Sequence, residues 1–201
     1  MINHEHKCIF IHIPKCGGSS VERHIDNRDW WVHAPAEKHL TANDARNKYA
    51  QYWDDYFKFS IVRNPYDIEV SWYHFKKHPF IHGREIGFSE FIKDESINTV
   101  AKISHGLTDK RWENIIPSVT DCYEYLSIDD TIAMDYIGKL ENIRQDFNTI
   151  CDKIGIPRQQ LLHVNKTNHK HYTEYYDDET KQIVAEKYAK DIEYFGYEFG
   201  E

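Results

Sequence analysis

Residues 8–20 of this chain read Cys8-Ile9-Phe10-Ile11-His12-Ile13-Pro14-Lys15-Cys16-Gly17-Gly18-Ser19-Ser20. The stretch begins as a short, mostly apolar and β-branched run that ends at a proline, which is typical of a central parallel strand covered on both faces. Gly17 and Gly18 then allow a sharp turn and a close approach of the backbone to a ligand. We expect Ser19 or Ser20 to cap a helix whose N–H groups and positive dipole end point back at the loop. Together with the charge of Lys15, this pattern predicts a site for a phosphate or a sulfate.

The position of the lysine separates this loop from the Walker-type nucleotide loop. That loop has the pattern G-x-x-x-x-G-K-[ST], with the lysine after the glycines. In this chain Lys15 comes before Gly17 and Gly18. An ordinary strand, turn and helix without a ligand would also use such glycines, so the function needs a second signal.

The second signal lies in residues 57–73, Phe57-Lys58-Phe59-Ser60-Ile61-Val62-Arg63-Asn64-Pro65-Tyr66-Asp67-Ile68-Glu69-Val70-Ser71-Trp72-Tyr73. Another apolar strand is followed by a good N-cap, Asn64, and by Pro65 as a first helical residue. Arg63 therefore falls at the carboxyl edge of the strand, where ligands of open α/β sheets collect. Helical spacing puts Ser71 on the same stripe as Asn64 and Asp67. An arginine fork and a hydroxyl suit a second phosphate, although Arg63 could instead only pair with Asp67.

The two segments together resemble the sulfotransferase superfamily, in particular its branch of carbohydrate sulfotransferases. In that family a P-K-x-G-(G/T)-(S/T)-(S/T) loop holds the 5′-phosphosulfate of 3′-phosphoadenosine 5′-phosphosulfate (PAPS), and an R-N-P-x-(D/x)-x-x-x-S segment holds its 3′-phosphate. The matching residues are Pro14, Lys15, Gly17, Gly18, Ser19, Ser20, Arg63, Asn64, Pro65, Tyr66, Asp67 and Ser71, with Cys16 at the variable loop position. The chain departs from the pattern at Ile68, where relatives often carry another arginine. A weaker resemblance continues through residues 136–147 and 191–197.

The resemblance implies an enzyme that transfers a sulfuryl group from PAPS to an acceptor hydroxyl, releasing 3′,5′-adenosine diphosphate (PAP), without a catalytic metal. Sulfuryl transfer is close to phosphoryl transfer, in which positioning and neutralisation of the leaving group dominate. Lys15 and the loop N–H groups would neutralise the leaving phosphate. Late polar loops close over the nucleotide in this superfamily, so Lys166 or Lys170 is a candidate for the 3′-phosphate.

A hydroxyl acceptor also needs a general base with a pKa near neutrality, which favours a histidine or a buried carboxylate. Our first candidate is His39, because it precedes a predicted helix after the first crossover and relatives carry a histidine in that region. Our second is Glu22, two residues after Ser20, where other sulfotransferases place a catalytic glutamate. Each residue also has an ordinary interpretation, His39 as a loop residue and Glu22 as part of a solvated helix face.

Composition limits the other possibilities. A chain of 201 residues with 40% hydrophobic content can bury one core, so we expect a single sulfotransferase domain over 1–201. The net charge of −8 argues against a nucleic-acid partner. No apolar run or secretory signal suggests a membrane, so we expect a cytoplasmic protein. The expected acceptor is a small molecule or a glycan. Cys8, Cys16, Cys122 and Cys151 include no C-x-x-C pair, which favours reduced thiols over zinc or disulfides. The sequence indicates no oligomeric state.

The remaining patterns predict alternating strands and helices. Strands are expected at 8–13, 58–62 and 133–139, and helices at 21–27, 41–52, 65–77, 143–154 and 177–190. Residues 80–128 lack a clear period and are expected to hold substrate-facing insertions or plain peripheral helices. The alternation predicts a three-layer α/β fold, P-loop-like, with a central parallel sheet flanked by helices.

Two rival functions stay open at this stage. A protein could keep the PAP or PAPS cradle and lack transfer activity. A P-loop nucleotide kinase-like enzyme would need a lysine after the glycines and a Mg²⁺-binding carboxylate at a second strand end, and neither is recognisable here. The carbohydrate acceptor rests on the branch that the motifs resemble.

Overall fold

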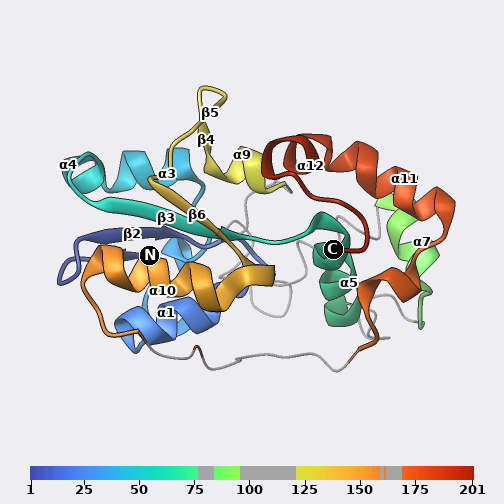
Figure 1. Cartoon of the computed structure of the whole chain (residues 1–201), viewed down its shortest axis with the longest axis horizontal. Helices are drawn as coiled ribbons and strands as arrows, with labels where there is room; N and C mark the ends of the chain where they lie inside the picture. Colours follow the sequence, from blue (N-terminus) through green and yellow to red (C-terminus); the bar gives the residue numbers. More distant parts are fainter. Residues whose placement is uncertain (77–83, 96–120, 159–160, 162–168) are drawn as a thin grey trace. The chain divides into compact units, whose positions relative to one another are not determined.

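The computed structural model describes residues 1–76, 84–95, 121–158, 161 and 169–201. The chain divides into two compact units (Figure 1). One unit, called unit 1 here, comprises Met1–Arg63 and Pro117–Asn165, and the other, unit 2, comprises Asn64–Ile116 and Lys166–Glu201. The single sulfotransferase domain over 1–201 stays a prediction.

Unit 1 is built on a four-stranded sheet. Its strands are β1 (Ile2–Asn3), β2 (Cys8–Ile11), β3 (Phe57–Val62) and β6 (Tyr136–Lys139), in the spatial order β1-β2-β3-β6. The three longer strands are parallel and β1 is antiparallel to β2. Ile11 lies beside Ser60, and Val62 lies beside Lys139. The carboxyl ends of the three parallel strands therefore reach the same edge of the sheet, with Arg63 directly after β3.

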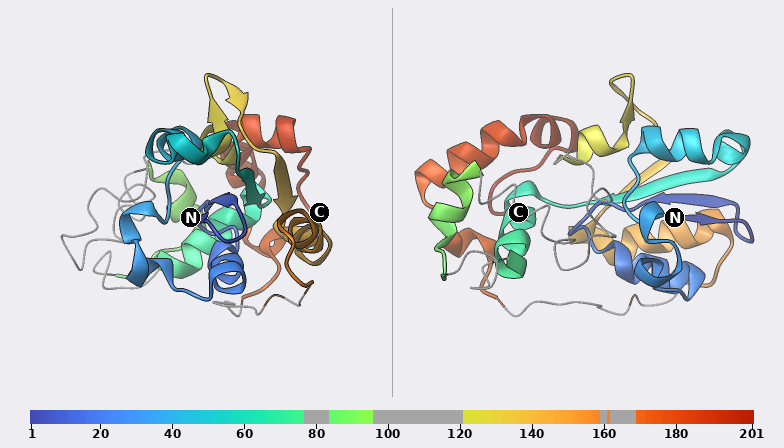
Figure 2. Two further views of the ribbon diagram at one scale, coloured as in Figure 1. Left: turned by 90° about the vertical axis from the view of Figure 1, so that its left-hand side faces the viewer. Right: turned by 180° about the vertical axis from the view of Figure 1, so that it is seen from behind.

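Helices cover both faces of this sheet. On one face α1 (Gly18–Asp26) and α10 (Ile143–Ile154) pack against the strands, and on the other lie α3 (Ala42–Lys48) and α4 (Ala50–Trp53) (Figures 1 and 2). The core between the sheet, α1 and α10 includes the buried side chains of Phe10, Val21, Ile25, Phe59, Ile61, Phe147 and Ile150. The prediction of an α/β fold with a central parallel sheet flanked by helices is confirmed, and the short antiparallel strand β1 was not predicted.

Short elements complete unit 1. They are α2 (Trp30–His33), the 3-10 turn η1 (Pro35–Glu37), α9 (Cys122–Leu126), the hairpin strands β4 (Ser127–Ile128) and β5 (Thr131–Ile132), and the 3-10 turn η3 (Leu140–Asn142). The segment between η1 and α3 carries Lys38 and His39, and both side chains are buried. This short crossover therefore brings two polar residues into the interior of unit 1.

Unit 2 is helical in the part that the structure describes. Its elements are α5 (Pro65–Lys76), α7 (Phe88–Lys93), the 3-10 turn η4 (Tyr172–Tyr175), α11 (Asp178–Lys187) and α12 (Ala189–Phe195). Buried Glu69 of α5 accepts hydrogen bonds from the Lys187 ammonium at 2.6 Å and the Tyr188 hydroxyl at 2.5 Å. This ion pair fixes α5 against the end of α11. Within the described ranges of both units, no helix has the length and apolar character needed to cross a membrane.

Several local predictions were correct and others were wrong. Asn64 caps α5, since its side-chain oxygen accepts from the Tyr66 N–H at 3.1 Å, and Gly155 ends α10 with φ 74°. Neither Ser19 nor Ser20 caps α1, because the helix begins at Gly18 with Gly17 as its N-cap.

Element boundaries also differed from the predictions. The predicted helix over 41–52 is divided at Tyr49, where ψ of 28° leaves the helical region, and the predicted helix over 177–190 is divided at Tyr188 in the same way. The third strand begins at Tyr136 rather than residue 133. The predictions for Lys166 and for most of residues 80–128 lie outside the described residues.

Candidate anion-binding and catalytic site

The loop between β2 and α1 has a constrained backbone. Lys15 and Gly17 both adopt left-handed conformations, with φ of 67° and 77°. For a residue with a Cβ this conformation costs about 1–2 kcal/mol, and such strain persists only where the surrounding structure fixes it. Turns that alternate left-handed with ordinary residues direct successive N–H groups to one side and form an anion-binding concavity. The backbone of this loop is therefore suited to an anion.

Close contacts explain both glycines of the loop. A Cβ on Gly17 would lie 2.8 Å from a methyl group of Leu140, directly after β6. A Cβ on Gly18 would lie 2.1 Å from Cδ2 and 2.3 Å from Nε2 of the His12 ring. The loop thus packs between the residue that follows β6 and the residue that follows β2. Because α1 starts at Gly18, its first N–H groups and its positive dipole end are at the loop.

Two cationic side chains meet at this loop. The guanidinium of Arg63 donates to the main-chain oxygen of Lys15 at 3.0 Å. Burial, together with the smaller effect of the Arg63 charge, lowers the pKa of Lys15 to about 8. Two positive charges held this closely repel each other, and an anion between them would remove that repulsion. The ends of β2 and β3 therefore bring two cationic residues together at the loop.

A second group of polar residues lies behind the loop. It consists of four buried side chains, with exposed fractions of 4% for His12, 1% for Glu22, 1% for Lys38 and 4% for His39. One oxygen of Glu22 accepts from His12 Nδ1 at 2.6 Å, and the other accepts from the Lys38 ammonium. His39 Nδ1 donates to the main-chain oxygen of His12 at 2.8 Å. We call these four residues the buried polar cluster.

A family model described as Sulfotransferase family matches residues 1–198 of the chain. The chain belongs to the sulfotransferase family. No curated protein and no solved structure matches it. Membership supports a transferase activity on sulfuryl groups, and the sheet with its flanking helices is the P-loop-like fold of this family.

The ionisation of the buried polar cluster follows from its contacts. Burial would by itself raise the pKa of Glu22, but the charges and hydrogen bonds of His12 and Lys38 outweigh it and hold that pKa below its ordinary value. Burial lowers the pKa of His12, against the opposing effect of Glu22. The carboxylate of this sulfotransferase is thus ionised and accepts from a neutral His12 and a charged Lys38.

The hydrogen bond of His39 decides its tautomer. A carbonyl oxygen only accepts, so the bond to the main chain of His12 places the His39 proton on Nδ1. In the neutral ring the lone pair is then on Nε2, the atom that can take a proton from a hydroxyl group. The rings of His12 and Trp31 pack against His39 with centroids at 4.5 and 5.3 Å.

The other predicted site residues are distributed over both units. Pro14 and Cys16 lie in the loop, with Cys16 buried, and Ser19 and Ser20 lie half-buried in the first turn of α1. Ser71 is buried in α5 of unit 2. Lys166 lies outside the described residues. The predicted roles of these residues stay predictions.

Two members of the buried polar cluster were missed by the sequence analysis. His12 and Lys38 were not candidates, although the sequence carried a signal for each. His12 interrupts the apolar run of residues 8–13, and a polar side chain in a buried strand must find a partner. Lys38 directly precedes the candidate base His39.

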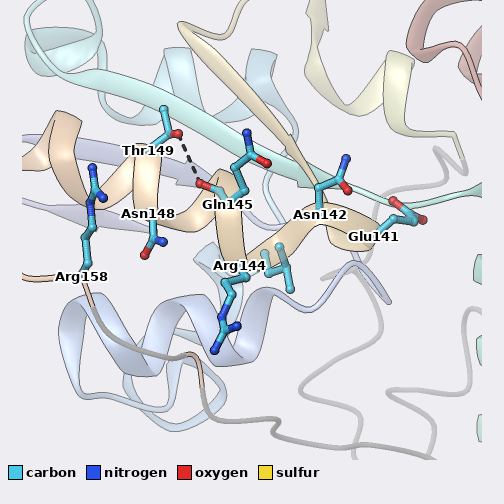
Figure 3. Close-up of a pocket in the computed structure, with 8 residues that line it drawn as sticks. Glu141, Asn142, Arg144, Gln145, Asn148, Thr149 and Arg158 are labelled. Atoms are coloured by element: carbon cyan, nitrogen blue, oxygen red, sulfur yellow. Dashed lines mark hydrogen bonds between the residues drawn. The ribbon is translucent and has the colours of Figure 1, made fainter.

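A polar hollow on α10 is separate from these residues (Figure 3). It is lined by Glu141, Asn142, Ile143, Arg144, Gln145, Asn148, Thr149 and Arg158. Thr149 donates to the main-chain oxygen of Gln145 at 3.3 Å, and Arg158 donates to Asp152 at 2.9 Å. None of the predicted site residues lines this hollow. In the part of the chain that the structure describes, no group of three or more His, Cys, Asp or Glu side chains could hold a metal ion.

Proposed function

We propose that this sulfotransferase transfers the sulfuryl group of PAPS to a hydroxyl group of a carbohydrate acceptor. One observation carries the proposal, namely the meeting of Lys15 and Arg63 at a loop whose backbone is suited to an anion. The two cations and the start of α1 can together bind the two anionic ends of the donor. The motifs around them resemble those that hold the two ends of PAPS, and the same resemblance supports the carbohydrate acceptor.

The residues of the loop fit the phosphosulfate end of this donor. The ammonium of Lys15 is a point charge that can follow a phosphate oxygen during reaction, whereas the planar fork of Arg63 suits the 3′-phosphate, which stays in one orientation. The first-turn N–H groups of α1 add neutral donors that need no reorganisation. Once bound there, PAPS supplies an activated sulfuryl group.

The transfer itself needs little covalent work from the protein. The acceptor oxygen forms a bond to sulfur while the bond from sulfur to the 5′-phosphate oxygen breaks, which yields a sulfate ester and PAP. Lys15 neutralises the charge that develops on the leaving oxygen. His39 takes the proton of the acceptor hydroxyl on Nε2. The loop thus stabilises the departing charge, and His39 removes the proton.

Charge considerations favour His39 over Glu22 as the general base. The carboxylate of Glu22 already accepts from His12 and Lys38, and its pKa is lowered, so it has little affinity for another proton. The Nδ1 of His39 donates to a carbonyl group, so in the neutral ring Nε2 is the nitrogen that can accept a proton. We therefore propose that His39, and not Glu22, is the general base.

Titration with PAP tests the proposed donor site. PAP should stabilise the protein in the absence of Mg²⁺, by about 2.7 kcal/mol at a concentration 100 times its dissociation constant. The measurement is the thermal unfolding midpoint with PAP, with ATP and Mg²⁺ as the comparison. Incubation of labelled PAPS with carbohydrate acceptors then tests transfer. PAP binding without transfer to any acceptor would favour a PAP-binding protein, and stabilisation only by ATP with Mg²⁺ would contradict the proposal.

The affinity for PAP should also depend on pH through Lys15. Binding of a phosphate requires the charged ammonium, whose pKa is about 8 in the free protein. Affinity should therefore be constant well below pH 8 and fall above it, by at most about tenfold per pH unit, while binding takes up a proton. Calorimetric titration from about pH 6.5 to 9.5 covers both sides of this pKa and measures both effects. Lys15→Arg, which stays charged throughout, should remove this slope.

A further inference from the structure

Glu22 contacts both residues that hold His39 in place. Its two oxygens accept from the ring of His12 and from the ammonium of Lys38. The main-chain oxygen of His12 is the acceptor for His39 Nδ1, and Lys38 directly precedes His39 in the chain. One carboxylate of α1 thereby fixes both the acceptor of the His39 hydrogen bond and the peptide that carries His39.

Packing around these residues leaves little freedom. The His12 ring stacks on Phe10 with centroids 5.6 Å apart, and its edge fills the space where Gly18 has no side chain. The Lys38 ammonium lies 5.5 Å from the centre of the Trp31 ring, which also borders His39. A shift of His12 or Lys38 would therefore move the groups against which His39 rests.

The charges within the group balance. Glu22 is ionised, Lys38 carries the opposite charge, and His12 is neutral. Removing only one charge of such a buried pair leaves the other uncompensated, whereas removing both does not. This difference allows the effect of the charge balance on folding to be separated from the effect on His39.

We infer that Glu22, His12 and Lys38 form a positioning unit that keeps His39 in its Nδ1–H tautomer, in which Nε2 is the basic nitrogen. The role in catalysis rests on the proposed function, but the effect on the tautomer does not. Glu22 acts through His12 and Lys38 and does not itself take the proton of the acceptor. The unit occupies the interior of unit 1, behind the loop that binds the donor.

The tautomer of His39 can be measured directly. Long-range proton–nitrogen correlation spectra of the full chain, assigned with His39→Ala, should give a protonated Nδ1 in the native protein. Glu22→Gln should shift His39 toward the Nε2–H tautomer or a mixture of the two. The exposed carboxylate variant Glu5→Gln is the matched control and should leave the spectrum unchanged. An unchanged His39 spectrum in a folded Glu22→Gln protein would overturn the inference.

Kinetics separate positioning from direct catalysis. Glu22→Gln should lower kcat about 10–100-fold, as observed when an orienting partner of a functional histidine is removed, with little change in KM for PAPS. In a His39→Ala background the same substitution should cause no further loss. A further loss of similar size in that background would mean that Glu22 acts on the substrate itself, and it would overturn the inference.

A paired variant keeps the test valid if Glu22→Gln does not fold. The double variant Glu22→Gln/Lys38→Met removes both charges and should fold better than Glu22→Gln alone, while His39 still loses its fixed tautomer. A native His39 tautomer in this double variant would contradict the inference. If the native protein shows the fixed tautomer but binds no PAP, the proposed function fails and the positioning unit stands.

Discussion

Replacing Lys15 by alanine is expected to lower the rate of sulfuryl transfer about 10²–10³-fold, the cost of removing one donor that stabilises developing negative charge. The residue meets Arg63 at the loop, and its main chain is held in a left-handed conformation. In the proposed mechanism its ammonium neutralises the charge that develops on the leaving oxygen. The measurement is kcat with saturating labelled PAPS, together with the PAP dissociation constant. Because the leaving oxygen carries its full charge in PAP, the affinity for PAP should fall together with kcat.

The exposed lysine Lys153 of α10 provides the matched control for this variant. Lys153→Ala makes the same change in net charge and should leave both quantities within about twofold, as for surface charges in general. A Lys15→Ala protein with the turnover of Lys153→Ala would remove the basis for the proposed mechanism. Unchanged folding, followed by circular dichroism, is required for both variants.

The elements that the sequence predicted well are those set by neighbouring residues. The apolar runs before Pro14 and Arg63 specify β2 and β3 because a short β-branched run has few alternatives. The cap at Asn64 and the left-handed end at Gly155 depend only on local backbone chemistry, so both were correct. The convergence of Lys15 and Arg63 also follows from sequence order, since parallel neighbouring strands end at one edge.

The predictions that were wrong concern elements that depend on contacts between distant parts of the chain. Ser19 and Ser20 satisfy the usual rules for an N-cap, yet Gly17 takes that position because the loop is packed between His12 and Leu140. The breaks at Tyr49 and Tyr188 occur where a buried tyrosine ring is held by residues far away in sequence, such as Glu69 for Tyr188. Helical periodicity continues through both positions and gives no sign of a break.

The buried polar cluster of the candidate site could not be predicted from the sequence for the same reason, because it depends on contacts between distant parts of the chain. Glu22 was a candidate base because of its place in α1, and its alternative was a solvated face. The structure buries it instead, because His12 from the end of β2 and Lys38 from the crossover both reach its carboxylate. Hydrogen bonds spanning 10 and 16 residues of sequence cannot be inferred from the spacing of any single segment.

Gly18→Ala is expected to lower the free energy of unfolding by about 3 kcal/mol, at the upper end of the range for overpacked sites. The new methyl group would lie 2.1 Å from the His12 ring, which is buried, stacked on Phe10 and bonded to Glu22. Alanine has a better helix propensity than glycine by up to about 1 kcal/mol, so propensity alone predicts the opposite sign. Urea unfolding measures the change. Gly87→Ala, where a Cβ meets nothing within 4 Å, is the control and should change stability by about 1 kcal/mol or less.

A second substitution identifies the cause of this loss. If the ring of His12 is the obstacle, Gly18→Ala should cost far less in a His12→Ala background, with a coupling of about 1–3 kcal/mol between the two sites. Additive effects would instead mean that the methyl group disturbs the backbone of the loop. Binding of PAP to Gly18→Ala provides an independent measurement, because displacement of the start of α1 from the loop should weaken it even at temperatures where the variant is folded. A Gly18→Ala protein with native stability and native PAP affinity would show that the loop and the His12 ring are not coupled.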